Sequence, residues 1–366
     1  MASNGLNRVC VWREDLLPGS ETFILNQARS FRRWSALLSG VRRFPSGLHV
    51  VPDFTIQGQR TLLHRVDRQV YWRSRTSVRL HHHLRSTLLV HAHFGPDGTR
   101  IARAARLARR PLVVTFHGYD ATMPLTELTV NYSALFRRAT RLLAVSEFIR
   151  TKLLEAGAPE ERITVAPIGI PVRPDSPRAD PGGHLLFVGR LIAQKGCGDL
   201  LEALSGMTDP PPLVVIGDGP LRAKLERHAE SLRVKASFVG EREPEYVARA
   251  MARSIALCVP SRNEGLGMVY LEAAAARCPV VSYASGGISE AVADGETGLL
   301  APEGNVRVLA EYLNRVISDT DLARRLGAAG RHRVEAEFDI RKRAAQLEEL
   351  YDDVVAHDGH RSHPLG

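Results

Sequence analysis

The sequence contains little cysteine and few aromatic residues, and it has no long hydrophobic run. Its four cysteines lack C-x-x-C spacing, which argues against a disulfide framework and against a zinc site. There is no apolar run of about 18 residues and no signal peptide, so we expect a cytoplasmic protein without a membrane-spanning helix. Aromatic residues make up 6% of the chain and do not alternate with arginines, so no nucleic-acid partner is expected.

Positive charge is concentrated in the first half of the chain. Residues 1–172 contain 25 Lys/Arg and 12 Asp/Glu, a net charge of +13, whereas residues 173–366 contain 24 and 28, a net charge of −4. This asymmetry favours an anionic surface or substrate near the first half. An arginine-rich composition that reflects a GC-rich genome is the alternative explanation.

Short β-branched runs alternate with helical stretches, which is typical of βαβ units and parallel sheets buried on both faces. The expected strands in the first half are 7–12, 48–52, 87–92, 111–116, 141–145 and 162–166. Those in the second half are 184–189, 213–217, 235–239, 254–259, 279–282 and 297–300. The pattern predicts an α/β protein with two Rossmann-like, doubly wound parallel-sheet domains.

A proline-rich stretch separates the two series of strands. Residues 167–183 contain five prolines, which prevent regular hydrogen bonding and mark a linker. We therefore predict an N-terminal domain over 1–172 and a second domain over 173–337. Residues 338–366 should form a helix that crosses back to the first domain, followed by a disordered tail.

Segment 57–85 combines seven arginines with apolar residues at helical spacing. The apolar residues are Leu62, Leu63, Val66, Val70 and Val78. One interpretation is an amphipathic helix that packs on the sheet with its arginines in water. The other is a helix that rests on anionic lipid. The run 81–83 of three histidines is interpreted as solvated surface.

Two cations follow the strand predicted at 184–189. Arg190 and Lys195 lie in a turn bounded by glycines, and in open α/β sheets such strand-end loops bind ligands. A guanidinium fork and an ammonium group suit a diphosphate. The turn 217–220 lacks G-x-G-x-x-G spacing and a Walker A pattern, which disfavours dinucleotide and P-loop sites.

Two carboxylates bracket the point where the strand 254–259 gives way to a helix beginning near Gly267 or Met268. Free N–H groups and the helix dipole favour an anion there. Glu264 would repel a phosphate, so it more plausibly accepts hydrogen bonds from hydroxyl groups, and Glu272 can reach another hydroxyl-bearing group. A sugar and a ribose joined by a diphosphate would satisfy the helix start, Glu264 and Glu272.

These residues resemble the motifs of retaining glycosyltransferases of family 4. Glu264 and Glu272 match the E-x7-E motif, and residues 189–196 match G-R-L-x-x-x-K-G. The resemblance covers nearly the whole chain and implies the GT-B fold, in which two Rossmann-like domains face a cleft. It also implies an N-terminal domain that binds the acceptor and a C-terminal domain that binds the nucleotide-sugar donor.

The resemblance assigns donor-binding roles in the second domain. Arg190 and Lys195 would bind the diphosphate, Glu264 the sugar hydroxyls as a catalytic residue, and Glu272 the nucleotide ribose. The backbone near phosphates and sugar would come from Leu266, Gly267 and Met268.

In the first domain, "TFHGYD" resembles the family's His-Gly at a strand end and places the catalytic His117 beside the transferred sugar. Gly19 would approach the donor through its backbone, although the family's usual Gly-Gly turn is here Gly-Ser, a form that resembles a bacterial polysaccharide-type branch. The possible acceptor or cleft residues are Ser20, Glu21, His93 and Asp120. Ser146 is interpreted as a helix cap.

The implied reaction transfers a sugar with retention from a nucleoside diphosphate to an acceptor hydroxyl, without a cofactor or metal. The acceptor is a lipid-linked saccharide or a small metabolite, and a lipid-linked one would bring the enzyme to the inner face of the cell membrane. The alternatives are a sugar-nucleotide epimerase or phosphorylase, and a non-catalytic basic protein that binds membranes. Neither the nucleotide base nor the acceptor follows from the sequence.

Overall fold

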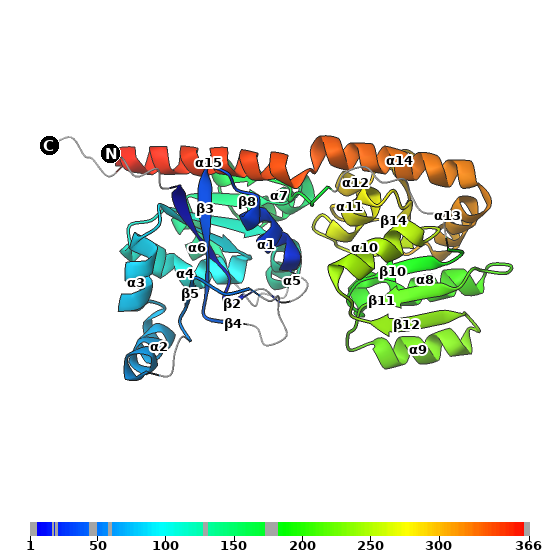
Figure 1. Ribbon diagram of the computed structural model, residues 1–366, viewed down its shortest axis with the longest axis horizontal. Helices are drawn as coiled ribbons and strands as arrows, with labels where there is room; N and C mark the ends of the chain where they lie inside the picture. Colours follow the sequence, from blue (N-terminus) through cyan, green and yellow to red (C-terminus); the bar gives the residue numbers. More distant parts are fainter. Residues whose placement is uncertain are drawn as a thin grey trace. The chain divides into compact units, whose positions relative to one another are not determined.

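The chain forms two compact units, as seen in a computed structural model (Figure 1). The structure describes residues 6–16, 18, 21–43, 50–57, 61–126, 131–172 and 182–361. The first unit comprises residues 1–171 together with 340–366, and the second comprises residues 172–339. The C-terminal segment therefore belongs to the N-terminal unit.

The N-terminal unit is built on a parallel sheet of seven strands in the order β5-β3-β1-β6-β7-β8-β9. These strands are β1 (Asn7–Trp12), β3 (Trp34–Gly40), β5 (Phe54–Thr55), β6 (Leu89–His93), β7 (Leu112–Phe116), β8 (Arg141–Ala144) and β9 (Ile163–Val165). A separate short pair joins β2 (Asp15–Leu16) to β4 (Arg42–Arg43). Most of the β6 and β7 side chains are buried and apolar, as expected of strands covered on both faces.

Eight α-helices belong to this unit within the described residues. They are α1 (Thr22–Arg29), α2 (Leu62–Ser74), α3 (Val78–Arg85), α4 (Gly95–Leu107), α5 (Tyr119–Thr126), α6 (Ser133–Arg138), α7 (Glu147–Glu155) and α15 (Ile340–Arg361). Leu347, Tyr351 and Val354 of α15 pack into the same core cluster as Val9 and Trp34. Figure 1 shows α15, in red, alongside β3 and α1.

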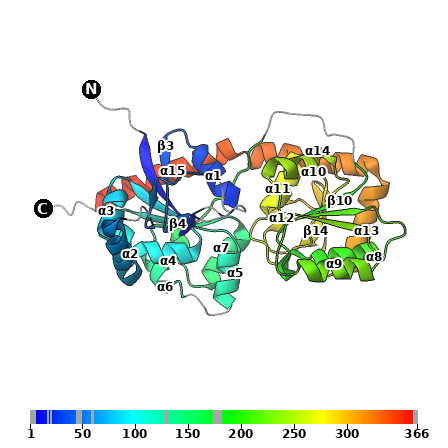
Figure 2. The ribbon, with the colours of Figure 1, turned by 60° about the horizontal axis from the view of Figure 1, so that its bottom comes forward.

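The C-terminal unit is built on a six-stranded parallel sheet in the order β12-β11-β10-β13-β14-β15. Its strands are β10 (Leu185–Val188), β11 (Leu213–Ile216), β12 (Ala236–Gly240), β13 (Leu257–Cys258), β14 (Val280–Ala284) and β15 (Gly298–Pro302). Its helices are α8 (Cys197–Ser205), α9 (Arg222–Ser231), α10 (Pro244–Arg253), α11 (Met268–Ala275), α12 (Ile288–Ala291), α13 (Val306–Ser318) and α14 (Thr320–Glu337). Figure 2 shows α10, α11 and α14 on one face of this sheet and α8, α9 and α13 on the other.

The predicted strands are confirmed in both units, with the exception of the strand predicted at 48–52 in the N-terminal unit. Residues 50–52 of the strand predicted at 48–52 are not in a strand, and residues 48 and 49 lie outside the described part of the chain. The strands here are β3 and the two-residue β5 instead. In β3, Ser35 and Ser39 interrupt the apolar residues, which weakens the β-branched pattern on which the prediction depended.

The described part of segment 57–85 forms two helices rather than one. Arg75 ends α2 with a left-handed φ of 55°, and Ser77 caps α3 by accepting a hydrogen bond from the Leu80 amide at 3.2 Å. The prediction that the three histidines form solvated surface is wrong for His83. Its ring stacks on Phe54 with centroids 4.5 Å apart, and burial lowers its pKa to about 4.

Across the residues that the structure describes, no helix has both the length and the apolar character needed to span a bilayer.

Candidate active site

The loops that carry the predicted donor-binding residues leave neighbouring strands of the C-terminal sheet. From β10 the chain continues to β11 and β12 on one side, whereas β13 is followed by β14 and β15 on the other. The strand order therefore reverses between β10 and β13, and their carboxyl ends flank the switch point where open α/β sheets form a crevice. Lys195 follows β10 and Glu264 follows β13.

Lys195 and Glu264 form an ion pair, with 2.5 Å between Nζ and Oε2. Both side chains are mostly buried, with 17% of each exposed. Their loops are joined by two further hydrogen bonds at Gln194: its carbonyl accepts from the Arg262 amide at 2.8 Å, and its Nε2 donates to the Asn263 carbonyl at 3.2 Å. The structure thus brings together two charged residues that lie 69 positions apart in the sequence.

The loop after β14 holds the Glu264 backbone in place. Gly287 donates its N–H to the Glu264 carbonyl at 2.8 Å, and the Ser285 hydroxyl accepts from the Asn263 amide at 2.9 Å. Gly286 has a φ of +61°, and a Cβ there would lie 2.4 Å from the Glu264 carbonyl oxygen. Only glycine fits this approach without moving Glu264.

We expect Gly286→Ala to reduce the sugar-transfer activity implied by the resemblance about tenfold, because relief of the clash displaces Glu264 from its loop geometry. Gly295→Ala is the matched control, since Gly295 also has a left-handed φ, +74°, but has nothing within 4 Å of its added Cβ. Both variants should lose about 1 kcal/mol of folding stability from backbone strain, and Gly286→Ala should lose more because its Cβ clashes with the Glu264 backbone. Steady-state kinetics and thermal unfolding of the pair measure the two effects separately. Equal activity losses in the two variants would contradict this role for Gly286.

Helix α11 begins beside Glu264, at the predicted position. Gly267 is its N-cap residue with a φ of +82°, and no side chain caps the helix. A Cβ at Gly267 would lie 2.3 Å from the Tyr270 ring. Leu266 is buried, while Met268 is half-buried. The first amides of this eight-residue helix therefore lack a side-chain cap, and they are the groups at which the sequence predicts an anion.

Arg190 and Glu272 are the exposed members of the predicted donor site. Arg190 directly follows the loop start at Gly189, and its guanidinium has no ion-pair or hydrogen-bond partner among the described residues. Desolvation raises the pKa of the Glu272 carboxyl. The residue as a whole is exposed, so solvent that reaches the side chain limits this desolvation effect.

A second ion pair supports the same loop and was missed by the sequence analysis. Arg262 contacts the Asp199 carboxylate at 2.6 Å, and the Tyr283 hydroxyl donates to the same oxygen at 2.9 Å. The Arg262 guanidinium also lies over the Tyr283 ring, 5.5 Å from its centroid. The only indication of this pair in the sequence was that Arg262 lies in the loop between the strand predicted at 254–259 and the helix that begins near Gly267.

In the N-terminal unit the two predicted histidines contact each other. His93 ends β6 and His117 follows β7, and their Nδ1 and Nε2 atoms are 3.0 Å apart. Phe23 and Phe94 pack against the His117 ring with centroids 5.0 and 4.5 Å away. Burial lowers the pKa of both histidines well below the ordinary value, so both are neutral at pH 7 and one must donate to the other.

His91 lies beneath this pair and extends the contact to the C-terminal helix. Its Nδ1 is 2.5 Å from the Tyr351 hydroxyl of α15, and its Nε2 is 2.7 Å from the Thr115 hydroxyl. Its ring packs on His93 with centroids 4.4 Å apart. Burial lowers the pKa of His91 to about 3.

We expect the His91→Gln variant to lose less folding stability than the wild type in mild acid. An unfolded histidine binds a proton below about pH 6.5, whereas the folded His91 binds it only near pH 3, so stability falls as the pH falls through this window. The difference between variant and wild type should change by about 1.4 kcal/mol per pH unit. Denaturant unfolding between pH 7 and 5 measures it. His82→Gln, at an exposed position, is the control, and parallel profiles for His91→Gln and wild type would contradict the expectation.

Two of the predicted acceptor residues use their carboxylates within the protein. Asp120 accepts hydrogen bonds from the amides of Gly95, His117 and Gly118 at 2.9 to 3.0 Å. Burial raises the pKa of Asp120, and the hydrogen bonds from these amides oppose that rise. Asp120 therefore fixes the loop that carries His117. Two further predicted positions lie outside the described residues: Ser20, predicted for the acceptor, and Gly19, predicted to bind the donor.

Glu21 belongs to a buried charge network that the sequence analysis did not foresee. The Arg13 guanidinium binds Glu21 at 2.8 Å and Asp97 at 2.6 Å. Asp97 also accepts from the Glu14 amide at 2.8 Å, and Glu14 pairs with Arg100. Burial raises the pKa of Glu21, and the Arg13 guanidinium counteracts that shift. Because its carboxylate is bound to Arg13, Glu21 connects the start of α1 to the residue that follows β1.

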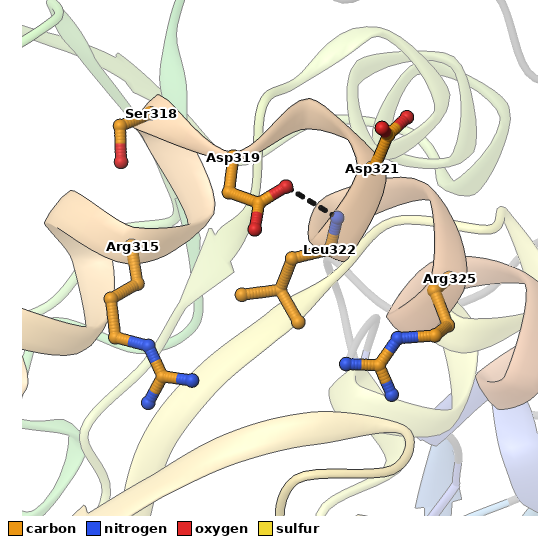
Figure 3. Close-up of a pocket in the computed structure, with 6 residues that line it drawn as sticks. All are labelled: Arg315, Ser318, Asp319, Asp321, Leu322 and Arg325. Atoms are coloured by element: carbon orange, nitrogen blue, oxygen red, sulfur yellow. Dashed lines mark hydrogen bonds between the residues drawn. The ribbon is translucent and has the colours of Figure 1, made fainter.

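A pocket at the junction of α13 and α14 lies apart from these residues. It is lined by Arg315, Ser318, Asp319, Asp321, Leu322 and Arg325 (Figure 3). Asp319 caps α14 by accepting from the Leu322 amide at 2.8 Å. None of the predicted site residues lines this pocket. Elsewhere among the described residues, no group of three or more His, Cys, Asp or Glu side chains is placed to hold a metal ion.

Two doubly wound parallel sheets, one with an uncapped helix start and an ion pair at its switch point, are the architecture of the GT-B fold class. A structure of Anabaena Alr3699/HepE in complex with UDP and glucose superposes with a TM-score of 0.79 at 22% identity, over 95% of this chain and 100% of that one. Sucrose-phosphate synthase from Thermosynechococcus elongatus superposes with a TM-score of 0.76 at 20% identity, over 96% and 100%. At these identities the likeness shows the fold.

The chain belongs to the glycosyltransferases of family 4. Residues 19–173 match the family described as Glycosyltransferase Family 4, and residues 172–333 match Glycosyl transferases group 1. Glycogen synthase of Mycobacterium tuberculosis is 30% identical over 282 residues, 72% of this chain and 68% of that protein. The GDP-mannose-dependent alpha-(1-6)-phosphatidylinositol monomannoside mannosyltransferase of Mycolicibacterium smegmatis is 30% identical over 274 residues, 68% and 71%. The protein is therefore a glycosyltransferase.

Proposed function

We propose that this glycosyltransferase transfers a hexose from a nucleoside diphosphate to an acceptor hydroxyl with retention, in the synthesis of a polysaccharide. The observation that carries the proposal is the Lys195–Glu264 pair at the switch point between β10 and β13, beside the uncapped start of α11. A cation and free amides suit a diphosphate, and the neighbouring carboxylate suits hydroxyl groups. Similar proteins include a putative colanic acid biosynthesis glycosyltransferase of Escherichia coli, 29% identical over 268 residues, 68% of this chain and 66% of that protein.

Each donor-site residue has a proposed contact. The Lys195 ammonium has three N–H groups, so it can keep Glu264 and bind a phosphate oxygen at the same time. Arg190 offers its guanidinium to the diphosphate, and the backbone of residues 266–268 faces the phosphates and sugar. Glu264 accepts from the sugar hydroxyls, and Glu272 accepts from the ribose. Arg190 and Glu272 are exposed, as is expected of side chains that contact a ligand.

The proposed chemistry breaks the bond between the anomeric carbon and the diphosphate oxygen and forms one to the acceptor oxygen on the same face. Negative charge grows on the departing diphosphate, where Lys195, Arg190 and the first amides of α11 stabilise it. A donor phosphate oxygen takes the acceptor's proton. The three cationic and dipolar groups supply the charge stabilisation that a divalent metal supplies in other enzymes, so we propose that no metal is needed.

The N-terminal unit contributes the acceptor side of this proposal. His117 contacts the transferred sugar as a neutral imidazole, and its hydrogen bond to His93 decides which of its nitrogens carries the proton. The excess of positive charge in residues 1–172, a net +13, suits an acceptor that carries negative charge.

Product analysis tests the proposal. UDP, GDP, ADP and TDP sugars are first screened by thermal shift, and the donor that stabilises the protein is then incubated with candidate acceptors, with and without EDTA. A transferred sugar with the donor's anomeric configuration, formed equally in EDTA, is the expected result. An inverted product would overturn retention. Donor isomerised without acceptor would indicate an epimerase, and a requirement for orthophosphate would indicate a phosphorylase.

A further inference from the structure

Helix α2 presents an apolar stripe to solvent. Leu62, Val66 and Val70 lie at four-residue intervals, which places them along one side of a helix. Their exposed fractions are 76%, 52% and 43%, and Trp72 of the same helix is 48% exposed. The structure thus contradicts the interpretation that these residues pack on the sheet. Figure 1 shows α2, in blue, beside α3 at the lower edge of the N-terminal unit.

A different side of α2 holds the helix to its unit. Tyr71 is fully buried, and its ring lies 6.5 Å from that of Trp12. Asp67 is also buried and pairs with Arg79 of α3 at 3.4 Å. These contacts use residues outside the Leu62–Val66–Val70 stripe, so the stripe is free to meet a partner without any change in the fold.

The charges around the stripe are positive and uncompensated. Arg65, Arg68 and Arg73 are exposed, and none of them has a carboxylate partner among the described residues. Asp67 is the one acidic residue of α2, and it faces Arg79. The exposed surface of α2 therefore carries apolar side chains and three unpaired guanidinium groups.

We propose that α2 binds the surface of an anionic lipid bilayer, with the stripe at the level of the acyl chains and the three arginines on lipid phosphates. Exposed Leu, Val and Trp side chains interspersed with arginines are the composition of helices that lie in the membrane interface. A second copy of the chain would place unpaired arginines near one another, and a nucleic acid would leave the apolar stripe in water. A bilayer with anionic headgroups satisfies both kinds of side chain.

Trp72 supplies a direct readout for the experiment. The chain has three tryptophans, and Trp12 and Trp34 are 0% and 1% exposed. The purified full chain is mixed with phosphatidylcholine vesicles that contain or lack phosphatidylglycerol. Binding is measured by sedimentation, and tryptophan emission is recorded with acrylamide quenching. We expect binding, a blue shift and protection from acrylamide with the anionic vesicles only, and we expect Trp72→Phe to abolish the spectral response while sedimentation persists.

Paired variants separate specific contact from general charge attraction. Leu62→Ser/Val66→Ser and Arg65→Glu/Arg68→Glu should each lower the vesicle partition coefficient about tenfold or more. Lys224→Glu/Arg227→Glu makes the same charge change at exposed positions of α9 and should leave most of the binding. An equal loss in this control would overturn the proposal, as would sedimentation without a change in Trp72 emission. Preferential binding to an oligonucleotide, or dimerisation that protects Trp72, would also overturn it. The measurement needs no donor, so it is independent of the proposed sugar transfer.

Discussion

Replacement of Lys195 by alanine is expected to lower kcat for sugar transfer about 10²- to 10³-fold. The proposed role of the ammonium group is to stabilise charge that develops on the departing diphosphate, and the loss of one such donor in a preorganised site typically has an effect of this size. The group is already placed in the donor-free protein, because its ion pair with Glu264 at 2.5 Å fixes its position. Its loss also leaves the Glu264 carboxylate without its cation.

Steady-state kinetics at saturating donor measure this effect, and thermal unfolding shows whether the variant is folded. Lys224→Ala is the matched control, because Lys224 is an exposed lysine of the same unit and lies on α9. Normal turnover by a folded Lys195→Ala protein would show that the charge on the diphosphate is stabilised by other groups.

Replacement of Glu348 by alanine is expected to lower the free energy of unfolding by about 3 kcal/mol or more. One carboxylate oxygen accepts hydrogen bonds from the backbone amides of Arg32, Arg33 and Trp34 at 2.7 to 2.9 Å. Glu348 is only 2% exposed, so water cannot easily replace the lost oxygen, and buried donors without a partner are costly. This contact attaches α15 to the turn before β3.

Denaturant unfolding of Glu348→Ala measures the loss, with Glu349→Ala as the control. Glu349 is the next residue of α15 and is exposed, so its removal should change stability by no more than about 0.5 kcal/mol. Similar stability changes in the two variants would show that α15 does not depend on the Glu348 contact.

Most strands could be predicted from the sequence because parallel strands covered on both faces read as short apolar runs. The same logic failed at β3, where Ser35 and Ser39 interrupt the run, and at β5, which has two residues. The order of the strands in the sheet could not be predicted in this way. Lys195 and Glu264 each follow a predicted strand, but their contact depends on β10 lying beside β13, which local patterns do not specify.

Residue type alone also did not predict which partner inside the protein a carboxylate would contact. Glu21 and Asp120 are acidic residues in strand-end loops, yet their oxygens bind Arg13 and three backbone amides. The sequence contained no indication of which partner each carboxylate would find. The apolar residues of α2 are a second example of what residue type did not predict, because they were predicted to be buried and are exposed. Their helical spacing predicted burial, but Tyr71 and Asp67 occupy the side that faces the protein.

The most direct measurement is a crystal structure of the protein bound to the nucleoside diphosphate sugar that stabilises it most. We expect a diphosphate oxygen within hydrogen-bond distance of Lys195 Nζ and of the first amides of α11, with Glu264 on the sugar hydroxyls. A diphosphate bound away from the carboxyl ends of β10 and β13, with the Lys195–Glu264 pair untouched, would contradict the account.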